Sequence, residues 1–339
     1  MEEKKVYKID DIARELGVSK TTVSRAISGK GRIGKETRER VLAFIEEHDY
    51  RPNVIAKSLA QNKTYNLGLI LPADFVETEF SFFKECMNGI CEVAERYNYD
   101  VLITMGTGEN FSHVRRLVHN RKVDGIILSR AVTDPEIPRY LKMQEMPFVV
   151  IGPSDDPDII TVDNQNQEAS EELTEIMLLK GVHRMALLGG TQSHKVTEKR
   201  FRGFVRAYEK NGISMEYSPV ILEISNNHVM AMKAVERALE AGVDGILCMD
   251  DVICALVMSC LREKNVRVPD DIKLASLYDS ERLEYNDPPI TSAHFDTKKL
   301  GHNAGLKLLD ALGETIEEEE LALTYQVVLR KSTAVSEGT

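Results

Sequence analysis

The sequence predicts an α/β protein in which an all-α helix-turn-helix head precedes a two-lobed body built on parallel sheets. Three short helical patterns with a tight glycine turn occupy roughly the first 50 residues, as in a helix-turn-helix. From residue 66 onward, continuous apolar runs alternate with amphipathic helical stretches. Such alternation is typical of parallel strands that helices cover on both faces. The 339 residues suffice for two or three domains of about 100–200 residues each.

The head begins with two helices joined by a short turn. The first helix has apolar residues at helical spacing and is expected to stop at Gly17: Ile9, Ile12, Ala13 and Leu16. Ser19 can cap a second helix over residues 20–27, because its hydroxyl accepts a backbone N–H that the helix leaves without a partner. A third helix, residues 35–48, is expected to pack Val41, Leu42 and Ile45 inward.

The second helix has one apolar and one polar face. Val23, Ala26 and Ile27 share the apolar face, and the other carries Lys20, Thr21, Thr22, Ser24 and Arg25. In a helix-turn-helix the second helix enters the major groove of DNA, and its first residues meet base edges. Lys20 can donate to guanine O6 and N7, and Thr21 can contact a thymine methyl group. A solvated polar face explains one such helix, but the whole three-helix pattern favours DNA binding.

A short apolar segment follows the head. Pro52 disfavours helix at Arg51, and Asn53 can cap a new helix over residues 54–60. A helix of about two turns is marginal in water. We therefore expect it to order against DNA, with Leu59 wedged into a minor-groove base step. The alternative is a linker helix that packs on a core of its own.

Charge is distributed unevenly along the chain. Residues 1–64 hold 14 Lys and Arg against 10 Asp and Glu, a net charge of +4, which leaves −15 for the rest of a chain whose net charge is −11. A basic head on an acidic body suits a protein that contacts phosphates with one end. The five cysteines lie in apolar segments, where buried free thiols of a reducing compartment are expected. The sequence has no secretory signal and no apolar run long enough to span a membrane, so a cytoplasmic protein is expected.

These residues together resemble the headpiece of the LacI/GalR family of bacterial repressors. The resemblance lies in residues 9–14, 17–25, 37–41, 50–53 and 56–59. It implies that Lys20 and Thr21 are the variable base readers and that further residues contact DNA: Ser19, Thr22, Ser24 and Arg25. It also places Asn53, Ala56 and Leu59 at a hinge, with Leu59 as the minor-groove lever. Gly34 stands where the family often has a capping Ser or Thr.

The body resembles the periplasmic-binding-protein-like core of the same family. Its markers lie at residues 123–127, 162–164, 200–204, 267–271 and 288–292. The expected domains are residues 1–52 for the helix-turn-helix, 53–64 for the hinge and 65–339 for the core. The N-lobe would comprise residues 65–161 and 294–321, and the C-lobe residues 162–293 and 322–333. The chain would cross between lobes near residues 160–164, 291–295 and 320–325.

The resemblance also implies an effector site between the lobes. It places Arg200, Asp279, Asp250 and Asp251 toward the effector, with Asp163 beside the cleft at the first crossing. Arginine can fork onto hydroxyls or a carboxylate, and aspartate accepts hydrogen bonds from sugar hydroxyls. The alternatives are that Asp250 or Asp251 caps the next helix and that Arg200 forms a surface ion pair.

Three departures from the family pattern concern the same site. Phe80 lies in a Phe-Ser-Phe segment where the family has Asn-Pro-Phe, Asn227 replaces a frequent aromatic residue, and Phe295 replaces a common glutamine. We expect these three residues at the effector site, with stacking on a sugar ring supplied by Phe80 or Phe295.

The predicted function is a sequence-specific transcriptional regulator, a repressor that binds a pseudo-palindromic operator as a homodimer or as a tetramer. Residues 82–97 and part of 250–264 are expected to form the dimer contact. The expected partners are double-stranded DNA and a sugar-like effector; no cofactor, metal or membrane is expected. The sequence lacks a phosphate-binding loop, an HExxH motif and a GxSxG elbow, which argues against an enzyme. Two alternatives are a regulator whose coeffector is a protein and an architectural DNA protein.

Overall fold

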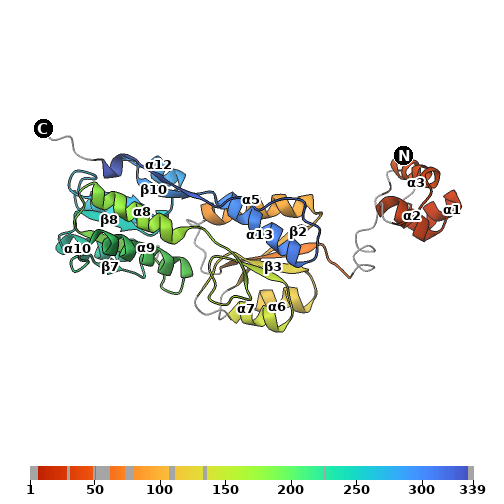
Figure 1. The fold of residues 1–339 in the computed structure, drawn as a ribbon, viewed down its shortest axis with the longest axis horizontal. Helices are drawn as coiled ribbons and strands as arrows, with labels where there is room; N and C mark the ends of the chain where they lie inside the picture. Colours follow the sequence, from red (N-terminus) through yellow and green to blue (C-terminus); the bar gives the residue numbers. More distant parts are fainter. Residues whose placement is uncertain are drawn as a thin grey trace. The chain divides into compact units, whose positions relative to one another are not determined.

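The computed structural model describes residues 7–28, 31–48, 50, 62–72, 80–106, 111–132, 136–224 and 227–334. The chain separates into two compact units, Met1–Thr64 and Tyr65–Thr339. In the described part of the chain, every helix is too short or too polar to cross a membrane. The three-helix head and the parallel-sheet body confirm the predicted fold class (Figure 1).

The first unit consists of α1 (Ile9–Leu16), α2 (Lys20–Ser28) and α3 (Lys35–Glu47). Gly17 ends α1 as predicted, because its φ of 66° is a left-handed conformation that glycine adopts without strain. One prediction for this core is wrong, because Leu42 is exposed. Phe44 packs against the core instead, with its ring stacked on His48 at 4.0 Å between centroids.

The N-lobe of the second unit has a five-stranded, fully parallel sheet in the order β2-β1-β3-β4-β5. Its strands are β1 (Asn66–Pro72), β2 (Asp100–Gly106), β3 (Gly125–Leu128), β4 (Phe148–Ile151) and β5 (Ile160–Val162). Its helices are α5 (Phe80–Arg96), α6 (Ser112–His119), α7 (Glu136–Met143) and α13 (Thr297–Ala311). Helices α5 and α13 lie side by side over one face, and α6 and α7 cover the other (Figure 1).

Helices α5 and α13 approach each other closely at two glycines. A Cβ atom on Gly301 would lie 1.9 Å from the carbonyl oxygen of Cys86, and one on Gly89 would lie 2.0 Å from that of Lys298. Only a residue without a side chain fits where backbones meet at this distance. This packing joins α13, which comes late in the sequence, to a sheet formed by residues 66–162.

The C-lobe has a six-stranded sheet in the order β11-β10-β9-β8-β6-β7, parallel except for β11. Its strands are β6 (Met185–Leu188), β7 (Val220–Ile221), β8 (Gly245–Cys248), β9 (Lys273–Ser276), β10 (Thr291–Phe295) and β11 (Tyr325–Val328). Helices α8 (Asn166–Leu179) and α9 (Lys195–Asn211) cover one face, and α10 (His228–Glu240) and α11 (Asp251–Glu263) the other. The short helices α12 (Glu281–Glu284) and η2 (Lys331–Thr333) complete this lobe.

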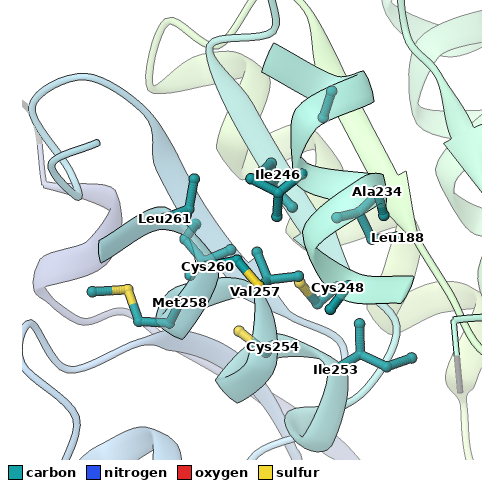
Figure 2. Close-up of a cluster of buried hydrophobic side chains, with 14 of the residues drawn as sticks. Leu188, Ala234, Ile246, Cys248, Ile253, Cys254, Val257, Met258, Cys260 and Leu261 are labelled. Carbon is teal, nitrogen blue, oxygen red and sulfur yellow. The ribbon is translucent and has the colours of Figure 1, made fainter. Parts of the chain in front are cut away.

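Three cysteines lie in the apolar core between β8, α10 and α11. Figure 2 shows Cys248, Cys254 and Cys260 among Val257, Leu261 and other apolar side chains. Burial raises the pKa of Cys86, in the other lobe, to about 12, which keeps this thiol protonated. Four of the five cysteines are buried free thiols, as predicted, whereas Cys91 is exposed because it lies on the solvent side of α5.

The chain passes between the lobes at three places. The first crossing follows β5, which belongs to the N-lobe sheet, and the third lies between Leu321 and β11. The second was expected within residues 291–295, but these residues form β10, which pairs with β9 and β11 of the C-lobe. The crossing therefore lies at Asp296, between β10 and α13.

Candidate functional site

The polar face of α2 is a candidate nucleic-acid interface. The Oγ of Ser19 accepts a hydrogen bond from the backbone N–H of Thr22 at 3.1 Å, which confirms that Ser19 caps the helix. Val23 and Ala26 are buried in the core of the unit. The opposite face exposes the predicted DNA-contacting side chains, with Thr22 half-buried: Lys20, Thr21, Ser24 and Arg25.

Two local contacts orient the basic side chains of this face. The Nζ of Lys20 lies 2.5 Å from Oδ1 of Asp10, yet the Lys20 side chain remains 67% exposed. The aliphatic part of Arg25 lies over Gly31, where a Cβ atom would come within 3.2 Å of it. Gly31 also has a φ of 92°, a conformation that favours glycine, so both the backbone angle and the close side chain of Arg25 disfavour a larger residue here. The predicted hinge residues Asn53, Ala56 and Leu59 lie outside the described residues.

A cavity of about 350 Å³ lies between the two lobes. Residues within two positions of the ends of five strands line it: Arg130 after β3, Gly152 after β4, Asp163 after β5, Asp250 after β8, and Tyr278 after β9. Carboxyl ends of parallel strands are where ligands bind in α/β folds. Five of the predicted effector residues meet on this cavity: Asp163, Arg200, Asp250, Asp251 and Phe295.

Arg200 is buried in the wall of this cavity, with 9% of the residue exposed. Its Nη1 donates to the carbonyl oxygen of Met249 at 2.5 Å, and its Nε donates to Oδ1 of Asn166 at 3.3 Å. Burial lowers the pKa of the guanidinium, although the carboxylate of Asp250 raises it in part. Within the described residues, no carboxylate lies within 4.0 Å of the guanidinium, so the surface ion pair considered as an alternative is not formed.

Three carboxyl groups face the same cavity. Burial raises the pKa of Asp163 and that of Asp251 to about 6, and it also raises the pKa of Asp250. Asp250 also caps α11, because its Oδ1 accepts from the backbone N–H of Ile253 at 2.8 Å. Asp250 therefore caps α11 and also lines the cavity. The cavity can offer hydrogen-bond acceptors on three carboxyl groups and a donor on Arg200.

Two predicted effector residues are not among those that line the cavity. Asn227 caps α10, and its Oδ1 accepts from the backbone N–H of Val229 at 2.8 Å. Asp279 forms an ion pair with Arg330 at 2.7 Å and accepts from Ser292 Oγ at 2.5 Å. Burial alone would raise the pKa of Asp279, but these two partners bring it below its usual value. The side chain of Phe80 lies outside the described part of the structure.

Several lining residues were not predicted from the sequence. Arg130 follows β3 and Tyr278 follows β9 by one residue, so the rule that ligands gather after strands would have found both. The ring of Tyr278 lies 5.9 Å from that of Phe82 on α5, so it links the two lobes. Asn166 and His194 lie at or just before the first turns of α8 and α9, where the sequence carries no distinctive signal.

Metal binding has no support in the described part of the chain. It contains no group of three His, Cys, Asp or Glu side chains arranged to hold an ion. The lining of the cavity likewise consists of hydrogen-bonding and apolar side chains.

Two family descriptions match this chain. Residues 8–53 match the bacterial regulatory proteins of the lacI family, and residues 174–333 match a periplasmic binding protein-like domain. The HTH-type transcriptional regulator MalR of Staphylococcus xylosus is 28% identical over 334 residues, which cover 96% of this chain and 97% of that protein.

Solved structures of regulators have the same fold. A lac repressor dimer bound to operator and an anti-inducer has a TM-score of 0.77, 23% identity, and coverage of 97% of this chain and 99% of that one. The transcriptional regulator CelR in complex with cellobiose has a TM-score of 0.70, 24% identity, and coverage of 96% and 99%. The lacI-family match and the relative MalR are descriptions of transcription regulators, which argues against the catalytic alternative.

Proposed function

Because the chain belongs to the LacI family of bacterial DNA-binding transcriptional regulators, we propose that it is a repressor controlled by a small sugar-like effector. One observation carries the effector part of this proposal. The buried guanidinium of Arg200 and the carboxyl groups of Asp163, Asp250 and Asp251 line one cavity between the lobes. A polyhydroxyl ligand matches this set, since its hydroxyl groups both donate and accept hydrogen bonds.

In the proposed DNA complex, α2 lies in the major groove. Lys20 and Thr21 read bases, because they stand at the exposed start of the helix. Ser19, Thr22, Ser24 and Arg25 contact the phosphates or the rim of the groove. Asn53, Ala56 and Leu59 act at the hinge, with Leu59 opening a minor-groove base step.

The proposed active species is a homodimer on a pseudo-palindromic operator. A C-lobe surface with exposed apolar side chains supports this proposal: Val229 is 60% exposed, Met230 42% and Tyr285 79%. These residues flank the end of α11, where Glu263 contacts His228 and Arg262 contacts Asn286. Part of the dimer contact expected along residues 250–264 would thus extend to the start of α10 and the end of α12. Two-fold pairing doubles the base contacts of a single head.

The proposed effector binds in the cavity and changes the arrangement of the two lobes. Asp163, Asp250 and Asp251 would accept hydrogen bonds from its hydroxyl groups, while Arg200 would donate to one of its oxygens. CelR, which has the same fold, forms a complex with cellobiose, so a sugar is the first ligand to test. The movement would alter the hinge and thereby DNA affinity, with a coupling free energy of about 1–3 kcal/mol.

Calorimetric titration of the full-length protein with cellobiose, maltose and a panel of other sugars tests the effector. One sugar should bind, and Arg200→Lys should weaken it by at least about tenfold, because a buried charged donor contributes roughly 1.5–3 kcal/mol. Arg202→Ala is the matched control, since Arg202 lies on the same helix with its side chain 59% exposed and contacts Glu198. Thermal unfolding of both variants verifies the fold.

The same protein tests the DNA part of the proposal. Selection from randomised duplex DNA should yield a pseudo-palindrome, and the bound sugar should change the affinity for that site. If no sugar binds and a carrier protein does, the result would favour a regulator whose coeffector is a protein.

A further inference from the structure

A group of contacts joins the two lobes at the wall of the cavity. The segment after β3, residues 130–132, belongs to the N-lobe, and residues 194–195 start α9 in the C-lobe. Val132 and His194 form an antiparallel β-bridge, and the N–H of Lys195 donates to the carbonyl oxygen of Ala131 at 3.3 Å. We call residues 130–132, 194 and 195, together with Asp155, the clasp.

Two side-chain contacts reinforce these backbone contacts. The Nζ of Lys195 lies 2.5 Å from Oδ2 of Asp155, which follows β4 in the N-lobe. The Nη1 of Arg130 donates to Nε2 of His194 at 3.3 Å. The Lys195 side chain is 15% exposed, so its charge is held in a partly desolvated position with Asp155 as its partner across the lobes. The hydrogen bond from Lys195 to Asp155 raises the pKa of Lys195 and lowers that of Asp155.

The clasp forms part of the cavity wall. Arg130, Ala131 and His194 line the cavity of about 350 Å³. The same three residues also line a second cavity of about 700 Å³ at the carboxyl ends of the N-lobe strands. The clasp is therefore the partition between the two cavities. Separation of the lobes at the clasp would join them and open the effector site.

We propose that Asp155 and Lys195 are positioning residues that hold the two lobes together beside the cavity. Their ion pair ties the start of α9 to the N-lobe loop at Asp155, and so helps to keep His194 beside Arg130 in the cavity wall. An exposed ion pair contributes little by itself, and Asp155 is 87% exposed. Here the ion pair adds to a backbone hydrogen bond and a second side-chain contact between the same two lobes. The consequence for regulation, that the clasp sets the resting state of the effector site, rests on the proposed function.

The neighbouring aspartate provides a matched control. Asp156 lies next to Asp155 in the same loop, but its Oδ2 contacts Lys142 of α7 at 2.6 Å, within the N-lobe. Substitution of either aspartate by lysine changes the net charge equally. Only Asp155→Lys places two positive charges opposite each other across the lobes. Exchange of both partners in Asp155→Lys/Lys195→Glu restores an attractive pair with the opposite polarity.

Hydrogen–deuterium exchange of the ligand-free full-length protein measures the clasp at its cross-lobe amide, that of Lys195. Asp155→Lys should raise exchange in the peptide covering residues 191–197 by up to about fivefold, the largest factor that corresponds to loss of an exposed ion pair. Asp156→Lys should leave this peptide unchanged, and the double variant should restore its protection. Small-angle scattering should report a larger radius of gyration for Asp155→Lys alone, which separates lobe opening from local fraying.

Unchanged exchange in Asp155→Lys would overturn the proposal, as would an equal increase in Asp156→Lys. Failure of the charge exchange to restore protection would also count against it. The experiment uses neither sugar nor DNA. A negative exchange result therefore does not contradict the proposed function. Likewise, a sugar titration without binding does not contradict the proposed role of the clasp.

Discussion

At the scale of single residues, the position of an aspartate in the fold decides its chemistry. Asp163 and Asp251 face the cavity without an ion pair among the described residues, and burial raises the pKa of each to about 6. Asp279 is also partly buried, but Arg330 binds both of its oxygens and brings its pKa below the usual value. One residue type therefore lines the cavity in one place and serves as a structural partner in another.

Asp251→Asn should stabilise the protein at pH 7. A pKa of about 6 in the folded state means that folding favours the protonated carboxyl, so the free energy of unfolding falls as the pH rises from about 4 to about 6. The rise from 3.8 to about 6 corresponds to up to about 3 kcal/mol, which the neutral amide would recover above pH 6. Denaturant unfolding at pH 5 and pH 7 should show a weaker pH dependence in the variant than in the wild type.

Asp271→Asn is the control with the opposite sign. Hydrogen bonds from Arg267 lower the pKa of Asp271 to about 2, so its ionised form stabilises the fold above pH 4 and this stabilisation is lost as the pH falls toward 2. The Asp271 variant should therefore be less stable than the wild type at pH 7. A loss of stability in both variants at pH 7 would contradict the account given for Asp251.

Lys20→Ala should relax base preference at one operator position by about 1–3 kcal/mol. Lys20 stands at the exposed start of α2, and its ion pair with Asp10 lies at the surface, where DNA can replace it. Binding to a set of single-base operator variants measures the effect. Lys35→Ala serves as the control, since the Lys35 side chain is 91% exposed at the start of α3. An equal loss for every sequence would assign Lys20 to a phosphate.

At the scale of elements, caps and close packing determine where helices lie. Ser19 and Gly17 define the turn of the head, and both are visible in the sequence as a helix start and a helix stop. The contact of α13 with α5 depends on Gly89 and Gly301, which allow backbones to meet. This contact gives the N-lobe a helix from the far end of the chain and thus fixes the second and third crossings.

Gly301→Ala should destabilise the body strongly. The new Cβ would meet backbone atoms of Cys86, which cannot move without shifting α5, and overpacking of a core costs about 1–3 kcal/mol or more. Gly305→Ala is the matched control on the same helix, because its Cβ would meet only side-chain atoms of Val93, the nearest at 3.1 Å. Thermal unfolding should rank Gly301→Ala well below Gly305→Ala. Equal melting temperatures would argue against close backbone contact.

At the scale of the whole molecule, charge and apolar surface are divided between the two units. The basic head carries the polar face of α2, while the acidic body carries the cavity and the exposed apolar residues of the C-lobe. Acidic charge on the body keeps phosphates away from it, so DNA contact is confined to the head. In the proposed dimer, two heads would meet one operator.

Tyr285→Asp should convert the proposed dimer to a monomer. A charge in the centre of an apolar contact must lose its hydration when the surfaces meet, which opposes association. Sedimentation velocity measures the change, and operator affinity should fall with it. Tyr217→Asp is the control, because Tyr217 is also exposed in the C-lobe but packs under Arg184. Dimerisation of the Tyr285 variant at the wild-type affinity would place the interface elsewhere.

Local sequence by itself determined the fold class, the bounds of the head helices to within about a residue, and the cap and exposed face of α2. These features depend on spacing, caps and alternation within a few residues of the chain, so they can be read without the fold. The prediction for Leu42 was wrong because Val41, Phe44 and Ile45 share one face of α3 at helical spacing, and Leu42 lies off that face.

Tertiary structure alone decided the composition of the cavity. Arg200 comes from α9, and Asp163, Asp250 and Tyr278 come from the ends of three different strands, so their meeting depends on sheet order and lobe crossings. Asp279 stands next to Tyr278 in the sequence, yet it pairs with Arg330, 51 residues away. Partners at such separations leave no local signal, and the same holds for the clasp between Asp155 and Lys195.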